Sequence, residues 1–591
     1  MLQVVRQEKS RSDRDLQENE IQDAGTTYQG NADLHRWKTY LAVACLYAGI
    51  TALFTYPQIT SLTTAFAESP IGSSSDQNIV MWDAWWAKKS LVDLKTNPFF
   101  TRYLYYPNGS SLALHALTFL NGVATIPFQV LMDKPKGLIL GCNIVIFLTF
   151  VITGVGMYAL TRSTGASREI AFFAGIALAF CPYRTMHIVH TDLLSMGWIA
   201  IYMLFLLKTL REKSLLNPVL GGIVFCVTVL TCDVYAFFLL LLTALFVMYT
   251  LLFDRKRLTA SATLFRFLAL FLLVLTVLIP KLLAIMRSGS AEFQPEWTLE
   301  ILSANPVGYV IPSHKHLLYR FLFDLLPDFK YYISGVPGHA TFLTFTVIAL
   351  AIIAIFKFRL RVIGFWLTVF LVFAVLSLGP RLHFYKWSTA FPLPYLLLYK
   401  WMPLFGVIRT PYRFVVLAEM GAIILACYGL TYITTSTVGG GERKDGPSMQ
   451  RPGIGNLLRH AIPIGFSLLL LIELWNVPFR RSVVPVPSIY TAIAEEEGEF
   501  AILDLPASKH SHLNRYMYYQ TLHEKPIPTG AVSRVDPALR EFLEDLLPTS
   551  SVPTELDSQE AERLRQNGIK YVIYHRFEDD LDDIYFVLKL F

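Results

Sequence analysis

Eleven long apolar runs constrain this chain more than any other feature of its 591 residues. A helix that crosses a bilayer needs about 20 mostly apolar residues. Runs near or approaching that length lie at residues 39–57, 138–160, 169–182, 193–208, 216–231, 234–252, 263–286, 340–356, 362–378, 414–434 and 460–477. Only 16% of the residues are charged, against about a quarter in soluble domains. The sequence therefore predicts a mainly α, polytopic membrane protein with about 11 transmembrane helices.

Two further apolar pieces, residues 114–132 and 392–408, are interrupted by Pro127 and Pro394. Cytoplasmic connections of membrane proteins are rich in Lys and Arg. If neither piece crosses, every short basic connection, including Arg255-Lys256-Arg257, falls on the side of the N-terminal tail. We therefore expect both pieces to be interfacial or re-entrant, the N-terminus to be cytoplasmic and the C-terminal tail to lie outside.

These crossings predict the division of the chain into domains. We expect a cytoplasmic tail at 1–37, a transmembrane domain at 38–478 with large outer loops at 58–137 and 287–339, and an extracytoplasmic domain at 479–591. In the last of these, residues 500–504 and 570–574 have the pattern of buried strands, and residues 536–547 and 555–567 that of helices. The tail is therefore predicted to be a small α/β domain.

Composition also excludes several classes of function. The net charge is +6, and the basic residues form short clusters between apolar runs, so a nucleic-acid partner is not expected. The six cysteines have no short spacing that would indicate disulfides or zinc. No Gly-rich nucleotide-binding loop is present, which disfavours ATP-driven transport by this chain alone.

The first outer loop contains the densest group of polar residues. Asp76 precedes a predicted helix over residues 77–94, and Asp83, seven positions later, shares a face with it. One interpretation is structural: Asp76 caps the helix, beside an aromatic belt at the membrane interface formed by Trp82, Trp85 and Trp86. The other is catalytic: Asp76 is a general base that acts on an acceptor hydroxyl.

A second outer connection, residues 183–192, carries His187, His190 and Asp192 just before a span begins. These side chains have the chemistry to position a sugar or a cation. The structural alternative is that Asp192 caps the next helix and the histidines lie in the headgroup layer.

The segment Arg409-Thr-Pro-Tyr-Arg413 is the third candidate site. Pro411 suits the first turn of the following helix, whose free N–H groups and positive dipole end would lie beside two guanidinium groups. This arrangement predicts binding of a lipid phosphate or pyrophosphate. Alternatively, both arginines reach ordinary phospholipid headgroups. Glu419 lies within the span that follows, and an intramembrane acid indicates function.

Several segments together resemble one superfamily of membrane enzymes. They are Ser75-Asp-Gln-Asn-Ile-Val-Met-Trp82, Leu104-Tyr-Tyr-Pro-Asn-Gly109, Cys181-Pro-Tyr-Arg-Thr-Met-His-Ile-Val-His190, Asn305-Pro-Val-Gly-Tyr-Val-Ile-Pro312, Phe405-Gly-Val-Ile-Arg-Thr-Pro-Tyr-Arg-Phe414 and Tyr518-Tyr-Gln-Thr-Leu-His-Glu-Lys-Pro526. In order and spacing they resemble the polytopic GT-C glycosyltransferases, and most of all uncharacterised GT-C-like proteins of bacterial membranes. The resemblance runs from the first span into the tail.

The resemblance implies an inverting glycosyltransferase in the bacterial cytoplasmic (inner) membrane. The donor would be a polyprenyl-phosphate sugar lipid, and the acceptor a glycan, lipid or protein on the outer face. Asp76 would be the catalytic residue. The expected substrate-binding residues are Asp83, His187, His190, Asp192, Arg409, Arg413 and Glu419. Two alternatives stay open: a flippase or transporter of lipid-linked glycans, and an inactive scaffold with the same fold.

We expect no cofactor. A divalent cation is the one candidate, because Asp76, Asp192 and His190 offer oxygen and nitrogen ligands. No dense acidic cluster surrounds them, so we expect no tightly bound metal.

Overall fold

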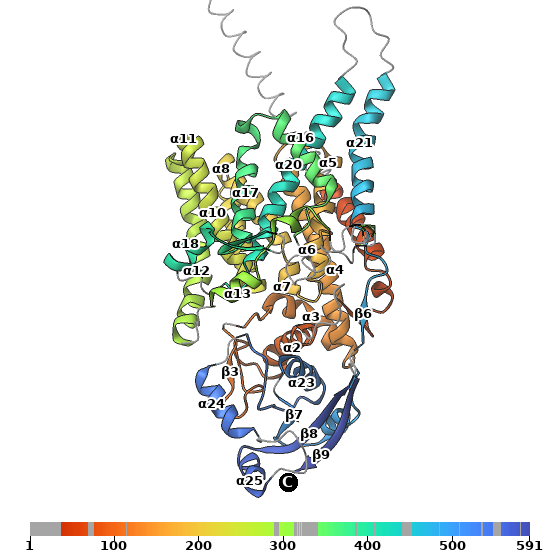
Figure 1. The fold of residues 1–591 in the computed structure, drawn as a ribbon, viewed down its shortest axis with the longest axis vertical. Helices are drawn as coiled ribbons and strands as arrows, with labels where there is room; N and C mark the ends of the chain where they lie inside the picture. The colour runs from red at the N-terminus through yellow and green to blue at the C-terminus, as the bar shows by residue number, and fades with distance from the viewer. Residues whose placement is uncertain are drawn as a thin grey trace, which may run out of the picture.

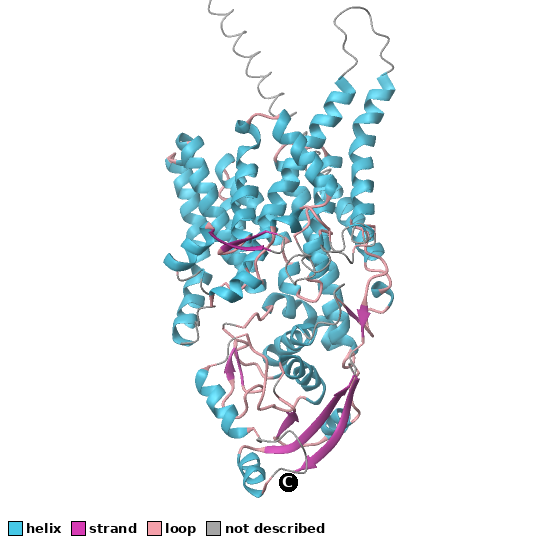
Figure 2. Ribbon diagram, viewed as in Figure 1, coloured by secondary structure: helices cyan, strands magenta, loops and turns pink. Residues whose placement is uncertain are grey.

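The computed structural model describes residues 37–68, 76–113, 115–288, 295–312, 316, 318–319, 321, 325, 341–384, 387–402, 405, 408–439, 452–483, 485–507, 509–533, 536–547, 557–578 and 581–591. These residues form a bundle of helices with a smaller α/β region at one end, where the C-terminus lies (Figure 1). Helices predominate, and the strands form small sheets (Figure 2). The predicted fold class is therefore confirmed.

Each of the eleven apolar runs forms a helix. The helices are Trp37–Phe54, α4 (Lys136–Ser163), α5 (Arg168–Ala179), α8 (Gly197–Arg211), α9 (Leu216–Thr231), α10 (Asp233–Phe253), α12 (Ser261–Ser288), α16 (Phe345–Lys357), α17 (Leu360–Ser377), α20 (Val415–Gly439) and α21 (Pro452–Glu473). Among the described residues, 8 helices are long and apolar enough to cross a membrane. Because α5, α9 and α16 have only 12, 16 and 13 residues, the count of eleven crossings stays a prediction.

The two interrupted apolar pieces form short helices. The first contains α3 (Phe119–Leu131, 13 residues) and the second α18 (Pro394–Trp401, 8 residues). The second piece begins at the end of a hairpin made of β4 (Arg381–Phe384) and β5 (Trp387–Pro392). Both helices are shorter than the roughly 20 residues that a crossing requires. Because α3 is as long as α16, the interfacial placement of the two pieces stays a prediction.

Small residues let the helices of the bundle approach closely. Tyr47 of the first helix is fully buried, and its hydroxyl donates to the carbonyl oxygen of Phe172 over 3.0 Å. A Cβ atom added at Gly154 of α4 would come within 2.8 Å of the Tyr47 ring, and one at Gly175 of α5 would overlap its hydroxyl. The first helix, α4 and α5 therefore pack through a large residue against two glycines, as is common between membrane helices.

Glu473 connects the last bundle helix to α16. Its carboxylate accepts hydrogen bonds from the backbone N–H groups of Phe345 and Thr346, the second over 3.1 Å. These are among the N–H groups that the first turn of a helix leaves without an intrahelical partner. Glu473, which is 2% exposed, thus caps α16 from the end of α21.

Two helices of the predicted first outer loop, residues 58–137, lie between the bundle and the tail (Figure 1). They are α2 (Asp76–Lys88), which continues as the π-helical turn η2 (Lys89–Asp93), and α3; the hairpin of β2 (Phe100–Thr101) and β3 (Ser110–Ser111) lies between them in sequence. Trp82, Trp85 and Trp86 of α2 are 0%, 2% and 2% exposed. The aromatic-belt interpretation of these tryptophans is therefore wrong, because they are buried against protein and not lipid headgroups.

The tail builds a three-stranded sheet in the order β7-β8-β9. Strand β7 (Ala501–Leu505) pairs in parallel with β8 (Ile569–Glu578), which pairs antiparallel with β9 (Leu581–Lys589). The helices are α22 (Ile489–Glu495), α23 (His510–His523), α24 (Pro537–Leu546) and α25 (Ser558–Gln566). Both predicted strands and both predicted helices are present, whereas α22, α23 and β9 were not anticipated by the sequence pattern.

The tail is attached to the first outer loop at several points. Strand β1 (Phe66–Ala67) pairs with β6 (Arg481–Ser482), and Ile527 N donates to Tyr103 O over 2.9 Å. The remaining short elements are η1 (Gln58–Thr60), α6 (Pro182–Met186), α7 (Thr191–Leu194), α11 (Arg255–Leu258), α13 (Glu296–Ile301), η3 (Pro306–Tyr309) and η4 (Pro411–Phe414). The loop and the tail therefore form one packed unit.

Candidate functional site

Asp76 is the first residue of α2, and its side chain is 43% exposed. His190 Nε2 lies 3.1 Å from Asp76 Oδ2. The hydrogen bond from His190 lowers the pKa of the Asp76 carboxyl below its usual value; burial opposes this, and electrostatic interactions with His190, His510 and Arg409 add to it. Asp76 is therefore an ionised, accessible carboxylate at neutral pH.

His190 and His187 lie on the connection that ends at α7. The Nδ1 atom of His190 is buried and has no hydrogen-bond partner among the described residues. An N–H group in that position would be unsatisfied, which favours the tautomer in which Nε2 carries the proton and donates it to Asp76. The two rings lie 5.7 Å apart.

His187 is held more tightly than His190. Its Nδ1 lies 2.7 Å from the carbonyl oxygen of Tyr183, and its Nε2 lies 2.6 Å from the hydroxyl of Tyr412. Burial lowers the pKa of His187 to about 3, so the ring is neutral. In this state Nδ1–H donates to Tyr183 and Nε2 accepts from Tyr412, which joins the second outer connection to the 409–413 segment.

Arg413 lies in η4, directly before α20. It is electrostatically coupled to Tyr412, Tyr183 and Asp192, and its Nε atom is buried with no hydrogen-bond partner among the described residues. Asp192, in α7, lies 4.0 Å from the thiol of Cys232. Asp192 and Arg413 therefore lie close enough to interact electrostatically, and one N–H group of the guanidinium has no partner among the described residues.

Arg409 is exposed, and its positive charge contributes to the lowered pKa of Asp76. Arg409 and Asp76 are more than three hundred positions apart in the sequence. Asp76 and Arg409 therefore lie close enough to interact electrostatically, and a shared site for them stays a prediction.

Asp83 has different surroundings from Asp76. It is 2% exposed, and its Oδ1 lies 3.0 Å from His115 Nε2. His115 Nδ1 in turn accepts from the backbone N–H of Ser533 over 3.2 Å. Burial raises the pKa of the Asp83 carboxyl, and His115 opposes that shift. Asp83 thus connects α2, the end of the first loop and the tail.

Glu419 lies inside the bundle, 3% exposed, next to Cys181 and Arg184. Its Oε2 has no hydrogen-bond partner in the part of the chain that the structure describes. Arg184 is fully buried and donates to Leu194 O over 2.6 Å and to Thr149 Oγ1 over 3.0 Å. The sequence pattern did not single out Arg184, since a single arginine beside a predicted outer connection is unremarkable until its burial is known.

The tail helix α23 also reaches Asp76. Asn514 Nδ2 donates to Asp76 Oδ1 over 3.5 Å, and His510 contributes to the lowered pKa of Asp76. Neither residue was a sequence candidate, because the helix and its contact with α2 depend on chain segments 438 positions apart.

Metal ligation and cavities add little to this site. Among the described residues, no three His, Cys, Asp or Glu side chains are grouped so as to hold a metal ion, and the expectation of no tightly bound metal stays a prediction.

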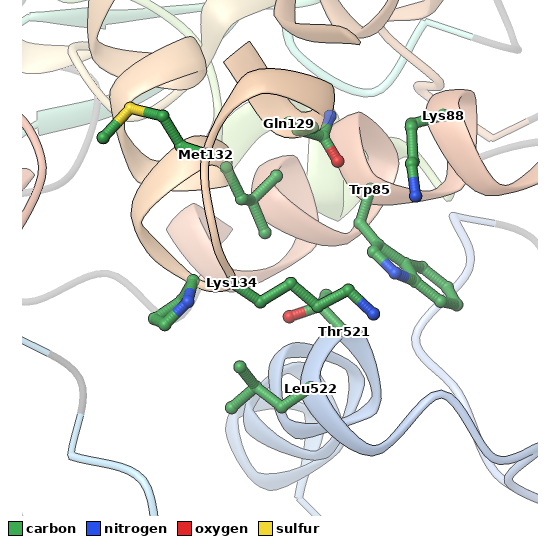
Figure 3. Close-up of a pocket in the computed structure, with 9 residues that line it drawn as sticks. Trp85, Lys88, Gln129, Met132, Lys134, Thr521 and Leu522 are labelled. Carbon is green, nitrogen blue, oxygen red and sulfur yellow. The ribbon is translucent and has the colours of Figure 1, made fainter. Parts of the chain in front are cut away.

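A small cavity lies at the far end of α2, between α3 and α23, lined by Trp85, Lys88, Gln129, Lys134 and Leu522, among others (Figure 3). Trp85 is nine residues from Asp76, about 13 Å along the helix, so this cavity is separate from the site.

No protein-family model matches the sequence, and no curated protein is significantly similar to it. Solved structures are similar in fold. The arabinofuranosyltransferase AftD from Mycobacteria has 14% sequence identity and a TM-score of 0.50, over 92% of this chain and 37% of AftD.

Two further solved structures are less similar. The oligosaccharyltransferase of Archaeoglobus fulgidus, in its apo form, is 13% identical over 91% of this chain and 69% of its own, with a TM-score of 0.48. ArnT from Cupriavidus metallidurans in the apo state is 14% identical over 92% of this chain and 93% of ArnT, with a TM-score of 0.41. At 14% identity the likeness to AftD, with its TM-score of 0.50, establishes the fold alone: the chain has the GT-C fold.

Proposed function

We propose that this chain, which has the GT-C fold, is a membrane glycosyltransferase that transfers a sugar from a polyprenyl-phosphate-linked donor to an acceptor on the extracytoplasmic face. The observation that carries the proposal is the series of contacts that leads from Asp76 through His190 and His187 to Tyr412 in the arginine segment 409–413. The Asp76 carboxylate can accept a proton, and the guanidinium groups of the arginine segment can bind a phosphate. The arabinofuranosyltransferase with the similar fold is, by its name, also a sugar transferase.

In the proposed reaction Asp76 is the general base. It accepts the proton of an acceptor hydroxyl while the hydroxyl oxygen forms a bond to the anomeric carbon of the sugar. His190 donates to Oδ2 and keeps the carboxylate ionised, and 43% of the Asp76 side chain is exposed for the acceptor to approach. Attack from the side opposite the leaving group inverts the anomeric configuration.

The bond between the anomeric carbon and the phosphate oxygen breaks in the same step, and the phosphate leaves with its electron pair. Arg409 and Arg413 stabilise this charge, since guanidinium groups bind phosphate through paired N–H donors. Two observations support this role: the Nε of Arg413 has no hydrogen-bond partner among the described residues, and Asp192 lies close enough to interact electrostatically with the guanidinium.

The remaining candidates have supporting parts in the proposal. His187 and Tyr412 hold the two connections together, and Asp83 ties α2 to the tail through His115. Glu419 belongs to the buried group around Arg184. A transport path would need intramembrane polar groups in contact with water, whereas Glu419 is enclosed in protein, so the transferase is favoured over a flippase.

Purified protein in vesicles that contain a radiolabelled polyprenyl-phosphate sugar tests this proposal. A transferase releases unglycosylated polyprenyl phosphate when extracts of cell-envelope glycans or lipids are supplied as acceptors. A flippase moves label between the leaflets and leaves the sugar–phosphate bond intact. Bond cleavage above the protein-free control supports the proposal, and scrambling without cleavage contradicts it.

A further inference from the structure

We propose that the extracytoplasmic tail completes the catalytic site and that Asn514 of α23 is a positioning residue for the Asp76 carboxylate. This inference rests on the proposed function, in which Asp76 is the base. It assigns a role to the tail that neither the fold nor the sequence pattern indicates.

The two oxygens of the Asp76 carboxylate are contacted from two different parts of the chain. His190, on the connection before α7, donates to Oδ2 over 3.1 Å. Asn514, from the tail, donates to Oδ1 over 3.5 Å. The plane of a carboxylate is defined once both of its oxygens have donors, so the pair sets the direction in which its remaining lone pairs point.

The burial of the three side chains differs in a way that suits this role. Asn514 is 0% exposed, the His190 side chain is 28% exposed and the Asp76 side chain is 43% exposed. The two donors therefore lie behind or beside the carboxylate, which keeps an accessible face.

Helix α23 is anchored on the first outer loop well away from Asn514. Trp82 Nε1 donates to Gln520 Oε1 over 2.7 Å, and Gln520 Nε2 donates to the carbonyl oxygen of Tyr103 over 2.6 Å. Six residues separate Gln520 from Asn514, about 9 Å along the helix. Helix α23 is thus fixed to the first outer loop at Gln520 and places the side-chain amide of Asn514 beside Asp76.

The next turn strengthens the anchor. Glu524 accepts from Lys89 over 2.7 Å and is also paired with Lys134. Burial raises the pKa of Glu524, but the two lysines outweigh burial and lower it to about 2. The ion pairs therefore persist throughout the pH range in which Asp76 is ionised. The ion-pair anchor at this end of α23 is therefore independent of pH near neutrality. The other titratable and charged groups that act on Asp76 are His190, His510 and Arg409, and none of them is changed in the test below.

A structural role and a positioning role predict different pH behaviour. An N–H donor favours the charged form of a carboxyl group, so loss of the Asn514 amide raises the pKa of Asp76. Because the active form is ionised, activity in the variant is lost at a higher pH as the solution is acidified. Loss of packing alone lowers the amount of folded protein and does not move this limb of the profile.

The test compares Asn514→Ala and Asn514→Asp with Ser511→Ala, an exposed position on the same helix, all in the full-length protein in vesicles. We expect kcat to fall about tenfold in Asn514→Ala and its acid limb to move up by roughly 0.5–1 pH unit. The isosteric Asn514→Asp should move the limb further, because a second acid beside Asp76 disfavours its ionisation. Ser511→Ala should match the wild type.

A second readout does not need activity. Water-soluble diazo compounds esterify carboxyl groups in their protonated form, and mass spectrometry of the Asp76 peptide gives the labelled fraction at each pH. The midpoint should rise in both Asn514 variants and stay unchanged in Ser511→Ala.

These readouts separate the two proposals. If the wild type transfers no sugar, the proposed function fails, and a labelling midpoint that rises still supports the contact between Asn514 and Asp76. If monodisperse Asn514 variants retain the wild-type midpoint and the wild-type acid limb, the positioning role is wrong.

Discussion

The imidazole of His190 lies 3.1 Å from the carboxylate of Asp76, although the two residues are 114 positions apart in the sequence. Asp76 begins α2, the helix that follows the first predicted crossing, and His190 directly precedes α7. The contact lowers the pKa of Asp76 and therefore extends to lower pH the range in which this carboxylate can act as a base.

Replacement of His190 by Ala should shift the pH profile and reduce the rate. The folded-state pKa of Asp76 is depressed, so its ionised form is present above that pKa and is lost as the pH falls through it. Without the imidazole donor the pKa rises, and the acid limb of the kcat profile moves to higher pH. We expect kcat to fall by about 10–100-fold. His190→Gln, whose amide can still donate to Asp76, should recover part of the loss; equal profiles for Ala and wild type would contradict this role.

Removal of the Arg413 guanidinium should weaken stabilisation of the leaving phosphate. A charged hydrogen bond contributes about 1.5–3 kcal/mol, so Arg413→Ala should lower kcat/KM for the lipid donor by roughly 10–200-fold. Arg413→Lys should recover only part, because an ammonium cannot bind phosphate bidentately. Arg257→Ala is the matched control, since Arg257 pairs with Asp254 beyond the end of α10 opposite to Asp233, about 30 Å along that helix. Donor titrations of the three variants check this, and an unchanged kcat/KM in Arg413→Ala would contradict it.

The interface between α2 and α23 should be a major source of stability for the outer region. Trp82 is fully buried, and large-to-small changes of buried aromatic residues cost about 3–5 kcal/mol. Trp82→Ala should therefore lower the Tm of the purified protein in a thermal unfolding assay and expose the tail to proteolysis. Trp387, which is 67% exposed, provides the control, and Trp387→Ala should leave Tm nearly unchanged. Equal Tm values for the two variants would show that α23 is not anchored through Trp82.

The apolar runs located the helices of the bundle because the signal for each helix is local and continuous. The positions of α4, α8, α10 and α20 follow from it directly. Helix α23 was not predicted, because its apolar residues do not recur with the period of a helix. Tyr516, Tyr518 and Tyr519 are all buried and face more than one neighbouring element.

Part of the candidate site was likewise predictable from the sequence. Asp76, Asp192 and the two arginines stand out as polar residues next to predicted spans. By contrast, Asn514 and His115 act through contacts with segments more than 30 positions away, which composition and spacing do not reveal. The tryptophans of α2 were misjudged for the same reason, since their partner helix lies at the other end of the chain.

Topology can be measured independently of activity. Ser511 in α23 and Thr259 after α11 are both exposed. In a cysteine-free background, Ser511→Cys in intact cells should react with a membrane-impermeant maleimide, and Thr259→Cys should react only after permeabilisation. This follows from the placement of all short basic connections in the cytoplasm. Reaction of both positions from the same side would place the tail and the Arg255-Lys256-Arg257 segment together and overturn the orientation.

The central claim is that Asp76 is the base for sugar transfer, and the most direct measurement is the turnover of Asp76→Asn in vesicles with labelled polyprenyl-phosphate sugar. Asparagine preserves the shape of the side chain and its place at the start of α2, so insertion and Tm should match the wild type, whereas it cannot accept the acceptor proton. The account predicts a loss of transfer of at least about 100-fold at every pH. Wild-type turnover in correctly inserted Asp76→Asn would contradict it.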